Sequence, residues 1–283
     1  MKKNRIITYI ILVFTLSMVT AAFSGCSKKA AKPAPKSTSE SEKKAPDTLK
    51  GLESSIQDVI KELDKKEEEK SEAEIKTETK TEVKQEEDKD KAKAETKQET
   101  EKEVKKESPE DKKWKTVTKK VEDIHKQWNS FQPEAVKAGA PKKVIDDFSN
   151  SLNILTTYVE AKDMLNTLFT ANELYQFIPE FMGQYTNKTP PDLKRIAYFI
   201  RDAKYNGMAN QWEKSKSSIN NLKSHWPIVK AQVKKEQENQ ASKMEFSIYE
   251  LEKVVAQSNM NLTKLKSDIA LENLKKLEET FEK

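Results

Sequence analysis

Hydrophobic residues recur every three or four positions through residues 114–283. The clearest stripe runs from Trp114 to Phe131 and has the form Trp-x2-Val-x3-Val-x2-Ile-x3-Trp-x2-Phe. This spacing puts apolar side chains on one face of an α-helix. Alternating apolar and polar runs, which would indicate β-strands, are missing from this part of the sequence. The pattern therefore predicts an all-α fold.

Prolines and one Asn-Gly pair divide this region into helices. Pro133 is expected to end the first helix, and Pro141 to begin a second one with a kink at Pro179. The segment Thr189–Asp192, Thr-Pro-Pro-Asp, predicts the start of a further helix, which Asn206–Gly207 is expected to end. We expect an elongated bundle of four to five helices.

The last predicted helix repeats its apolar residues in alternating steps of four and three, which is typical of a bundle seam or a coiled coil. The positions are Met244, Ile248, Leu251, Val255, Ser258, Leu262, Leu265 and Ile269. The same seam offers a surface for self-association of the chain.

The four tryptophans fall into two matching segments. Residues 114–128 align with residues 212–226, and each segment is followed by a proline and then by Val-Lys-Ala. The match predicts two duplicated helical hairpins, with an extra helix at residues 193–203 between them. Because the tryptophans lie on the apolar stripes, we expect them to pack in a core instead of forming an aromatic ligand surface. This Trp-x13-Trp pattern faintly resembles uncharacterised helical domains of Gram-positive envelope proteins, a resemblance that implies no activity.

The sequence before residue 114 has a different composition. Residues 27–113 contain no aromatic residue and are dominated by Lys, Glu, Ala, Ser and Thr. Such a segment buries too little apolar surface to fold, so we expect residues 26–113 to be a disordered, charged linker and residues 114–283 to be the bundle domain. One island has apolar residues at helical spacing: Leu49, Leu52, Ile56, Val59, Ile60 and Leu63. It is either a short solvated amphipathic helix or a segment that docks on the bundle or on a partner.

The N-terminus carries a targeting signal. Lys2, Lys3 and Arg5 precede an apolar stretch that leads to Ser24-Gly25-Cys26. This order resembles a bacterial lipoprotein signal, which implies cleavage of residues 1–25 and attachment of a diacylglycerol to Cys26. The alternative is an uncleaved membrane anchor. Cys26 is the only cysteine, so the mature chain has no internal disulfide.

Residues suited to chemistry are few. Glu122 and His125 form one Glu-x-x-His pair, whereas a di-iron bundle needs two such pairs and further glutamates. Non-covalent haem would need His125 or His225 together with a methionine such as Met164, Met182 or Met244. Tyr185, Tyr198, Tyr205 and Asn206 could rim a groove, but nothing in the sequence distinguishes them. We expect no enzyme activity, because the hydrolase and phosphate-binding motifs are missing.

Charge adds little to this picture. The formal net charge of +5 approaches neutrality once Lys2, Lys3 and Arg5 are removed with the signal, and no basic cluster suggests nucleic-acid binding. The sequence thus predicts a lipid-anchored protein on the outer face of the cell membrane. Its helical bundle would bind a protein or a cell-wall partner without catalysis and without a cofactor. The alternative is a metal- or haem-binding bundle for uptake, sensing or electron transfer.

Overall fold

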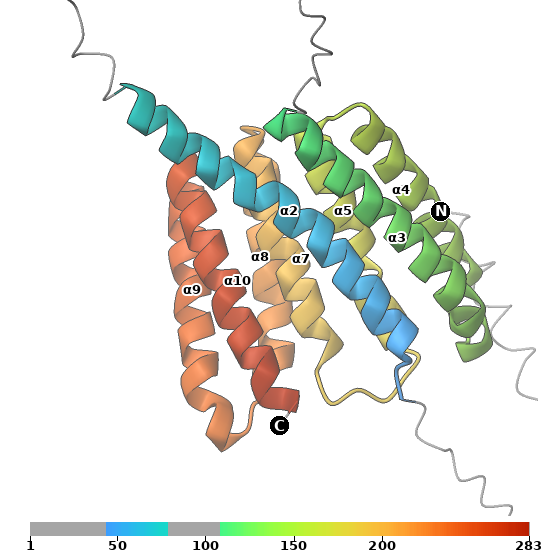
Figure 1. Ribbon diagram of the computed structural model, residues 1–283. Helices are drawn as coiled ribbons and strands as arrows, with labels where there is room; N and C mark the ends of the chain where they lie inside the picture. The colour runs from blue at the N-terminus through green and yellow to red at the C-terminus, as the bar shows by residue number, and fades with distance from the viewer. Residues whose placement is uncertain (1–43, 79–107, 283) are drawn as a thin grey trace, which may run out of the picture. The chain divides into compact units, whose positions relative to one another are not determined.

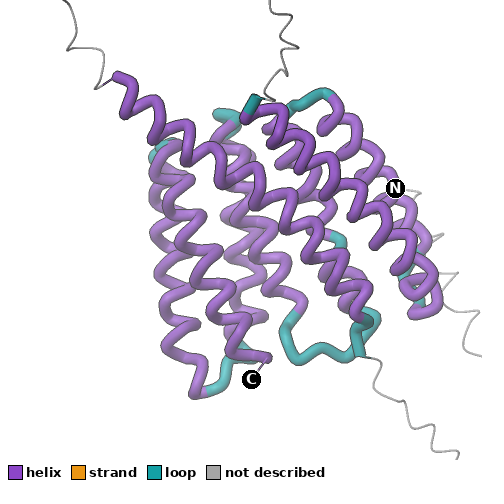
Figure 2. Tube along the Cα trace, in the orientation of Figure 1, coloured by secondary structure: helices purple, strands orange, loops and turns teal. Residues whose placement is uncertain are grey.

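The computed structural model describes residues 44–78 and 108–282, with side chains at 44–64 and 108–282 (Figures 1 and 2). Within these ranges the chain forms helices and contains no strand, only an isolated bridge between Lys44 and Thr186. The all-α class predicted from the sequence is confirmed. The predicted signal, Cys26 and most of the predicted linker lie outside the described residues.

The first four described helices pack in a closed ring, which we call the N-terminal bundle. They are α2 (Asp47–Glu78), α3 (Pro109–Ala138), α4 (Lys142–Glu160) and α5 (Met164–Gln176). Each helix packs against the next, and α2 also packs against α5. Short α6 (Ile178–Met182) follows α5 and leads out of this bundle.

The last four helices repeat the arrangement, which we call the C-terminal bundle. They are α7 (Pro191–Met208), α8 (Trp212–Lys230), α9 (Glu238–Ala256) and α10 (Met260–Glu282), with the 3-10 turn η1 (Lys235–Gln237) before α9. Consecutive helices are in contact, and α10 returns to pack on α7. Both bundles belong to one compact unit and meet where α5 packs on α7.

The matching tryptophan segments, residues 114–128 and 212–226, lie within α3 and α8, the second helix of each bundle. By order and packing, α2 corresponds to α7, α4 to α9 and α5 to α10. The duplicated element is therefore a four-helix bundle, and not only the hairpin expected from the sequence. The helix expected at residues 193–203 is not an addition between the copies, because it belongs to α7, which opens the second one.

Helix α2 shows that part of the predicted linker belongs to the fold. The apolar positions of the island, Leu49 to Leu63, are all between 0 and 3% exposed. In Figure 1 α2 crosses in front of the other helices, and its partners include α3 and α5. The interpretation of this island as a free, solvated helix is wrong, and docking on the bundle is what occurs. Likewise α3 begins at Pro109, ahead of the expected boundary, with Ser108 capping its first turn.

The helix end expected at Pro133 is also wrong. Pro133 lies inside α3, which continues to Ala138 and ends where Gly139 adopts a left-handed φ of 101°. Pro227 lies inside α8 in the same way. A proline removes one backbone donor, and in α3 the buried Phe131 and Ala135 hold both sides of Pro133 against the core.

The predicted seam near the C-terminus is divided between two helices. Helix α9 ends at Ala256, and Ser258 takes a positive φ of 53° in the turn before α10. The positions before the turn are buried, but Leu262, Leu265 and Ile269 on α10 are 38–53% exposed. The turn resets the helix phase, so α10 faces the core with Thr263, Ser267, Ala270, Leu274 and Leu277 instead. Self-association through this surface stays a prediction.

The tryptophans pack in the core as expected, with one exception. Trp114, Trp128 and Trp226 are 3–6% exposed, whereas Trp212 is only half-buried. The Trp128 ring lies 4.2 Å from that of Phe148, and its indole nitrogen donates a 3.0 Å hydrogen bond to Ser149. These contacts join α3 to α4 and fix one wall of the N-terminal bundle.

Candidate functional site

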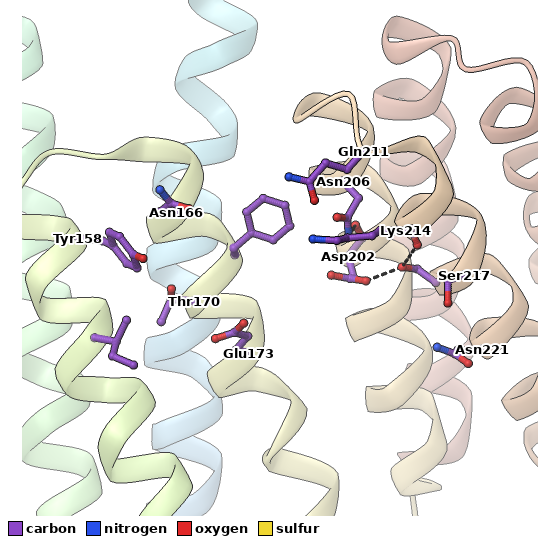
Figure 3. A pocket seen from close by; sticks show the side chains of 13 residues that line it. Tyr158, Asn166, Thr170, Glu173, Asp202, Asn206, Gln211, Lys214, Ser217 and Asn221 are labelled. Carbon is purple, nitrogen blue, oxygen red and sulfur yellow. Dashed lines mark hydrogen bonds between the residues drawn. The ribbon is translucent and has the colours of Figure 1, made fainter.

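A cleft of about 600 Å³ lies between the two bundles, and we call it the inter-bundle cleft. Its walls come from α4 and α5 on one side and from α7 and α8 on the other (Figure 3). A volume of this size falls within the range of small-molecule sites. Most of its lining side chains carry amide, hydroxyl or charged groups, so it suits a polar ligand.

One face of α5 lines the cleft. Asn166, Phe169, Thr170 and Glu173 follow one another at helical spacing and all contribute to the wall. The helix begins in this register because the Asp163 side chain accepts a hydrogen bond from the backbone N–H of Asn166. Ile154 and Tyr158 of α4 extend the same wall (Figure 3).

Thr170 is the most unusual member of this wall. Its side chain is only 3% exposed, and it makes no hydrogen bond within the part of the chain that the structure describes. Its oxygen is not among the buried side-chain atoms without a partner in the described residues, so the hydroxyl is accessible from the cleft. In this cleft the position opposite Thr170 is open to an incoming polar group.

The opposite wall is formed by the α7–α8 hairpin. Asn210 takes a left-handed φ of 56° in its turn, which brings α8 back alongside α7. Asp202 of α7 accepts a hydrogen bond from the Ser218 hydroxyl of α8, and the Asn206 amide donates to the backbone carbonyl of residue 202. These contacts hold the Asp202 carboxylate at the cleft surface, facing Glu173 (Figure 3).

The two carboxylates of the cleft both have raised pKa values, although Glu173 is exposed and Asp202 half-buried. Burial raises the pKa of Glu173, and the nearby charge of Asp202 raises it further. Burial also raises the pKa of Asp202, although the Ser218 hydrogen bond and the charge of Lys214 oppose this effect. Glu173 has no ion pair or hydrogen bond among the described residues. Asp202 thus has a cation, Lys214, near it in the cleft, whereas Glu173 is an exposed carboxylate.

A smaller cavity of about 290 Å³ adjoins the cleft, between α6, α7 and α8. Tyr198 lines this cavity, and its burial and the charges of Asp202 and Glu173 raise its pKa to about 12. His225 also lines this cavity; its ring stacks on Phe199 and forms a 2.9 Å contact with a carboxylate oxygen of Asp192.

The structure does not bring the residues considered for metal or haem together. His125 is exposed on α3, where its Nε2 lies 2.9 Å from the Thr156 hydroxyl, and Glu122 is exposed on the same helix. His225 lies in the other bundle. Among the described residues no group of three or more His, Cys, Asp or Glu side chains is arranged to hold a metal ion. Cys26, the predicted lipid site, lies outside the described residues.

The sequence analysis found only part of the cleft. Of the four residues considered for a groove, Asn206 lines the cleft and Tyr198 the adjoining cavity. Tyr205 is fully buried and Tyr185 half-buried, and neither lines them. The sequence analysis did not identify Glu173 and Thr170. A polar helix face that lines a cleft has the same sequence pattern as a polar helix face that is open to solvent.

Comparison with protein-family models, curated proteins and solved structures found no match to this chain. None of the described helices is long and apolar enough to cross a membrane.

Proposed function

We propose that this protein is a lipid-anchored cell-envelope protein that binds a cell-wall or protein partner, without catalysis, in the inter-bundle cleft. The observation that carries the proposal is the cleft itself. It combines a ligand-sized volume with amide, hydroxyl and carboxylate groups from both walls, among them Thr170, Glu173 and Asp202. Polar groups held on rigid helices around one cleft are typical of a binding site that is formed before its ligand arrives.

The location in the envelope is supported by the sequence around Cys26. A lipid at this residue would tether the chain to the membrane through the segment before α2. The two bundles supply a rigid frame, because the cleft walls come from four different helices that pack within and between bundles. A binding role fits this frame better than catalysis, since neither a histidine nor a cysteine is among the residues that line the cleft.

Cosedimentation with purified cell-wall sacculi tests the proposal. The probe is the chain from residue 26 onward with Cys26→Ser, so that it is free of lipid. We expect it to sediment with sacculi, and Ser217→Trp to abolish this by filling the cleft from the exposed side of α8. Ser242→Trp is the matched control, because Ser242 is exposed on α9 away from the cleft.

A protein partner would be revealed by a photo-crosslinking residue placed at position 217 in intact cells, with position 242 as control. Discrete adducts at 217 alone would assign the cleft to a protein. Equal sedimentation of wild type and Ser217→Trp, together with equal adducts at both positions, would contradict a binding role for the cleft.

A further inference from the structure

The exposed apolar side chains of this protein are concentrated on α9 and α10. Among the described residues nine large hydrophobic side chains are 38–72% exposed, and six of these nine belong to the two helices. Met260 begins α10, and the other five make up a surface that we call the hairpin face: Phe246, Tyr249, Leu262, Leu265 and Ile269. Single exposed apolar residues are ordinary on a protein, but a group of them marks an interaction surface.

Contacts between the two helices show that the hairpin face is continuous. Glu250, one turn after Phe246 on α9, forms a 3.4 Å ion pair with Lys266 of α10. Lys266 is flanked along α10 by the exposed apolar residues of that helix. On α9 the Lys253 ammonium group lies 5.4 Å from the centre of the Tyr249 ring and 3.9 Å from Glu250. The exposed sides of α9 and α10 therefore lie next to each other.

The hairpin face is separate from the core and from the inter-bundle cleft. Helix α10 packs on α7 and α9, and its buried residues are Thr263, Ser267, Ala270, Leu274 and Leu277. The cleft is lined by α4, α5, α7 and α8. In Figure 1 α9 and α10 lie on the side of the bundles away from α3 and α4. The hairpin face can thus be covered by a partner while the cleft stays open.

The spacing of the exposed residues of α10 favours a like helix as the partner. Leu262, Leu265 and Ile269 are separated by three and four positions, which is the repeat of a two-helix seam. A second copy of the chain supplies a helix with the same repeat. The same surface then takes part on both sides of the contact, as in most homodimers.

The size of the hairpin face agrees with a dimer contact. Its five side chains are large and about half exposed, so they present roughly 500–600 Å² of apolar surface, at the upper end of the largest apolar patch on an ordinary monomer. A stable interface buries about 800 Å² on each partner, and its rim is polar. The hairpin face and the charged residues around it together supply a contact of this size.

The charges around the hairpin face also favour a second copy over a charged partner. Both signs are present and already paired: Glu250 lies beside Lys253 and Lys266, and Glu272 pairs with Lys276 further along α10. A strongly acidic or basic partner, or an anionic membrane surface, would meet like charges as well as opposite ones. A second copy brings equal numbers of the same acidic and basic groups, which a two-fold rotation can place opposite each other.

We infer that the hairpin face binds a second copy of this chain in a two-fold dimer, with the exposed stripe of α10 at the centre of the contact and Phe246 beside it. The inference is independent of the proposed function, because it uses no residue that lines the cleft. Each dimer carries two inter-bundle clefts.

Light scattering coupled to size-exclusion chromatography tests the dimer. The chain from residue 26 onward with Cys26→Ser is measured up to about 1 mM, the upper end of specific affinities. We expect the mass of a dimer at high concentration. Leu265→Glu should raise the dissociation constant at least about tenfold, because it places like charges in an apolar contact. Val136→Glu is the matched control, since Val136 is 59% exposed on α3, outside the hairpin face.

Cross-linking locates the contact without a destabilising charge. Cys26 is the only cysteine, so in the Cys26→Ser chain an introduced cysteine is unique. With a short bismaleimide we expect covalent dimers of Leu265→Cys, because a two-fold axis at the α10 stripe brings the two copies of this position together. Val136→Cys should stay monomeric at the same concentration.

Three outcomes would overturn the inference. The first is a wild-type chain that is monomeric at every concentration, and the second is a dimer that persists in both Leu265→Glu and Phe246→Glu. The third is flotation with phosphatidylglycerol vesicles that is lost in Leu265→Glu while no dimer forms in solution, which would assign the hairpin face to a lipid surface. None of these results affects the sedimentation of the chain with sacculi, which tests the cleft separately.

Discussion

Lys194 of α7 forms an ion pair with Glu53 of α2, with 2.5 Å between its Nζ and the Glu53 Oε1. Both side chains are largely buried, and Glu278 of α10 is a second partner of the same lysine. Ten residues later in α7 Lys204 repeats the arrangement with Asp64 of α2 and Asp268 of α10, at 3.3 and 2.8 Å. Through these ion pairs, two lysines of α7 link α2 to the C-terminal bundle.

Removal of the Lys194 charge should destabilise the fold. Burial by itself would lower the pKa of this lysine, but Tyr175, Glu53 and Glu278 outweigh it and raise the pKa. Lys194→Met leaves two carboxylates in a poorly solvated position without a counter-charge, and we expect a loss of about 3 kcal/mol in the free energy of unfolding. Denaturant unfolding measures it. Lys50→Met, which removes an exposed pair with Asp47, should leave stability nearly unchanged.

Helix α2 should stay bound after the chain is cut between α2 and α3. A site-specific protease sequence inserted between residues 84 and 100 allows this cut. Because Leu52 and Ile56 are fully buried, we expect the two fragments to coelute in size-exclusion chromatography and to separate only in denaturant. Ile56→Asp, which places an unpaired charge in the core, should release the α2 fragment without denaturant. Separation of the unmodified fragments would show that α2 is held by the covalent connection alone.

The periodic apolar stripes predicted the all-α class and the buried faces of α3 and α8, because a helix with one buried face carries apolar residues every three or four positions. The apolar stripe of α2 was also visible in the sequence, but the stripe alone did not show that α2 packs on the bundle. Its polar positions Glu53 and Asp64 are satisfied by lysines far away in the sequence, so its composition resembles that of a solvated helix. The sequence pattern did not predict the turn at Ser258, because this turn contains neither proline nor glycine.

The periodicity of the sequence did not predict the cleft either. Glu173 and Asp202 are brought together by the packing of α5 on α7, a contact between the two bundles. The tryptophan repeat showed that the chain is duplicated, but it did not show how the copies face each other. Such contacts depend on which helix faces remain after each bundle has closed its own core.

The tryptophans of the repeat should contribute unequally to stability. Trp128→Ala removes a buried ring and a hydrogen bond to Ser149, so we expect a loss of about 3–5 kcal/mol. Trp226→Ala should behave similarly, while Trp212→Ala should cost clearly less because this side chain is only half-buried. Thermal unfolding of the three variants tests the order. Equal melting temperatures for Trp128→Ala and Trp212→Ala would contradict it.

Lipid attachment at Cys26 predicts a specific processing defect. Cys26→Ala should leave an unprocessed precursor or release the protein into the medium, because the thiol that carries the lipid is lost. Mass spectrometry and membrane fractionation measure both effects, with Ser27→Ala as the control. A Cys26→Ala protein with the mass and membrane fraction of the wild type would rule out the lipoprotein signal.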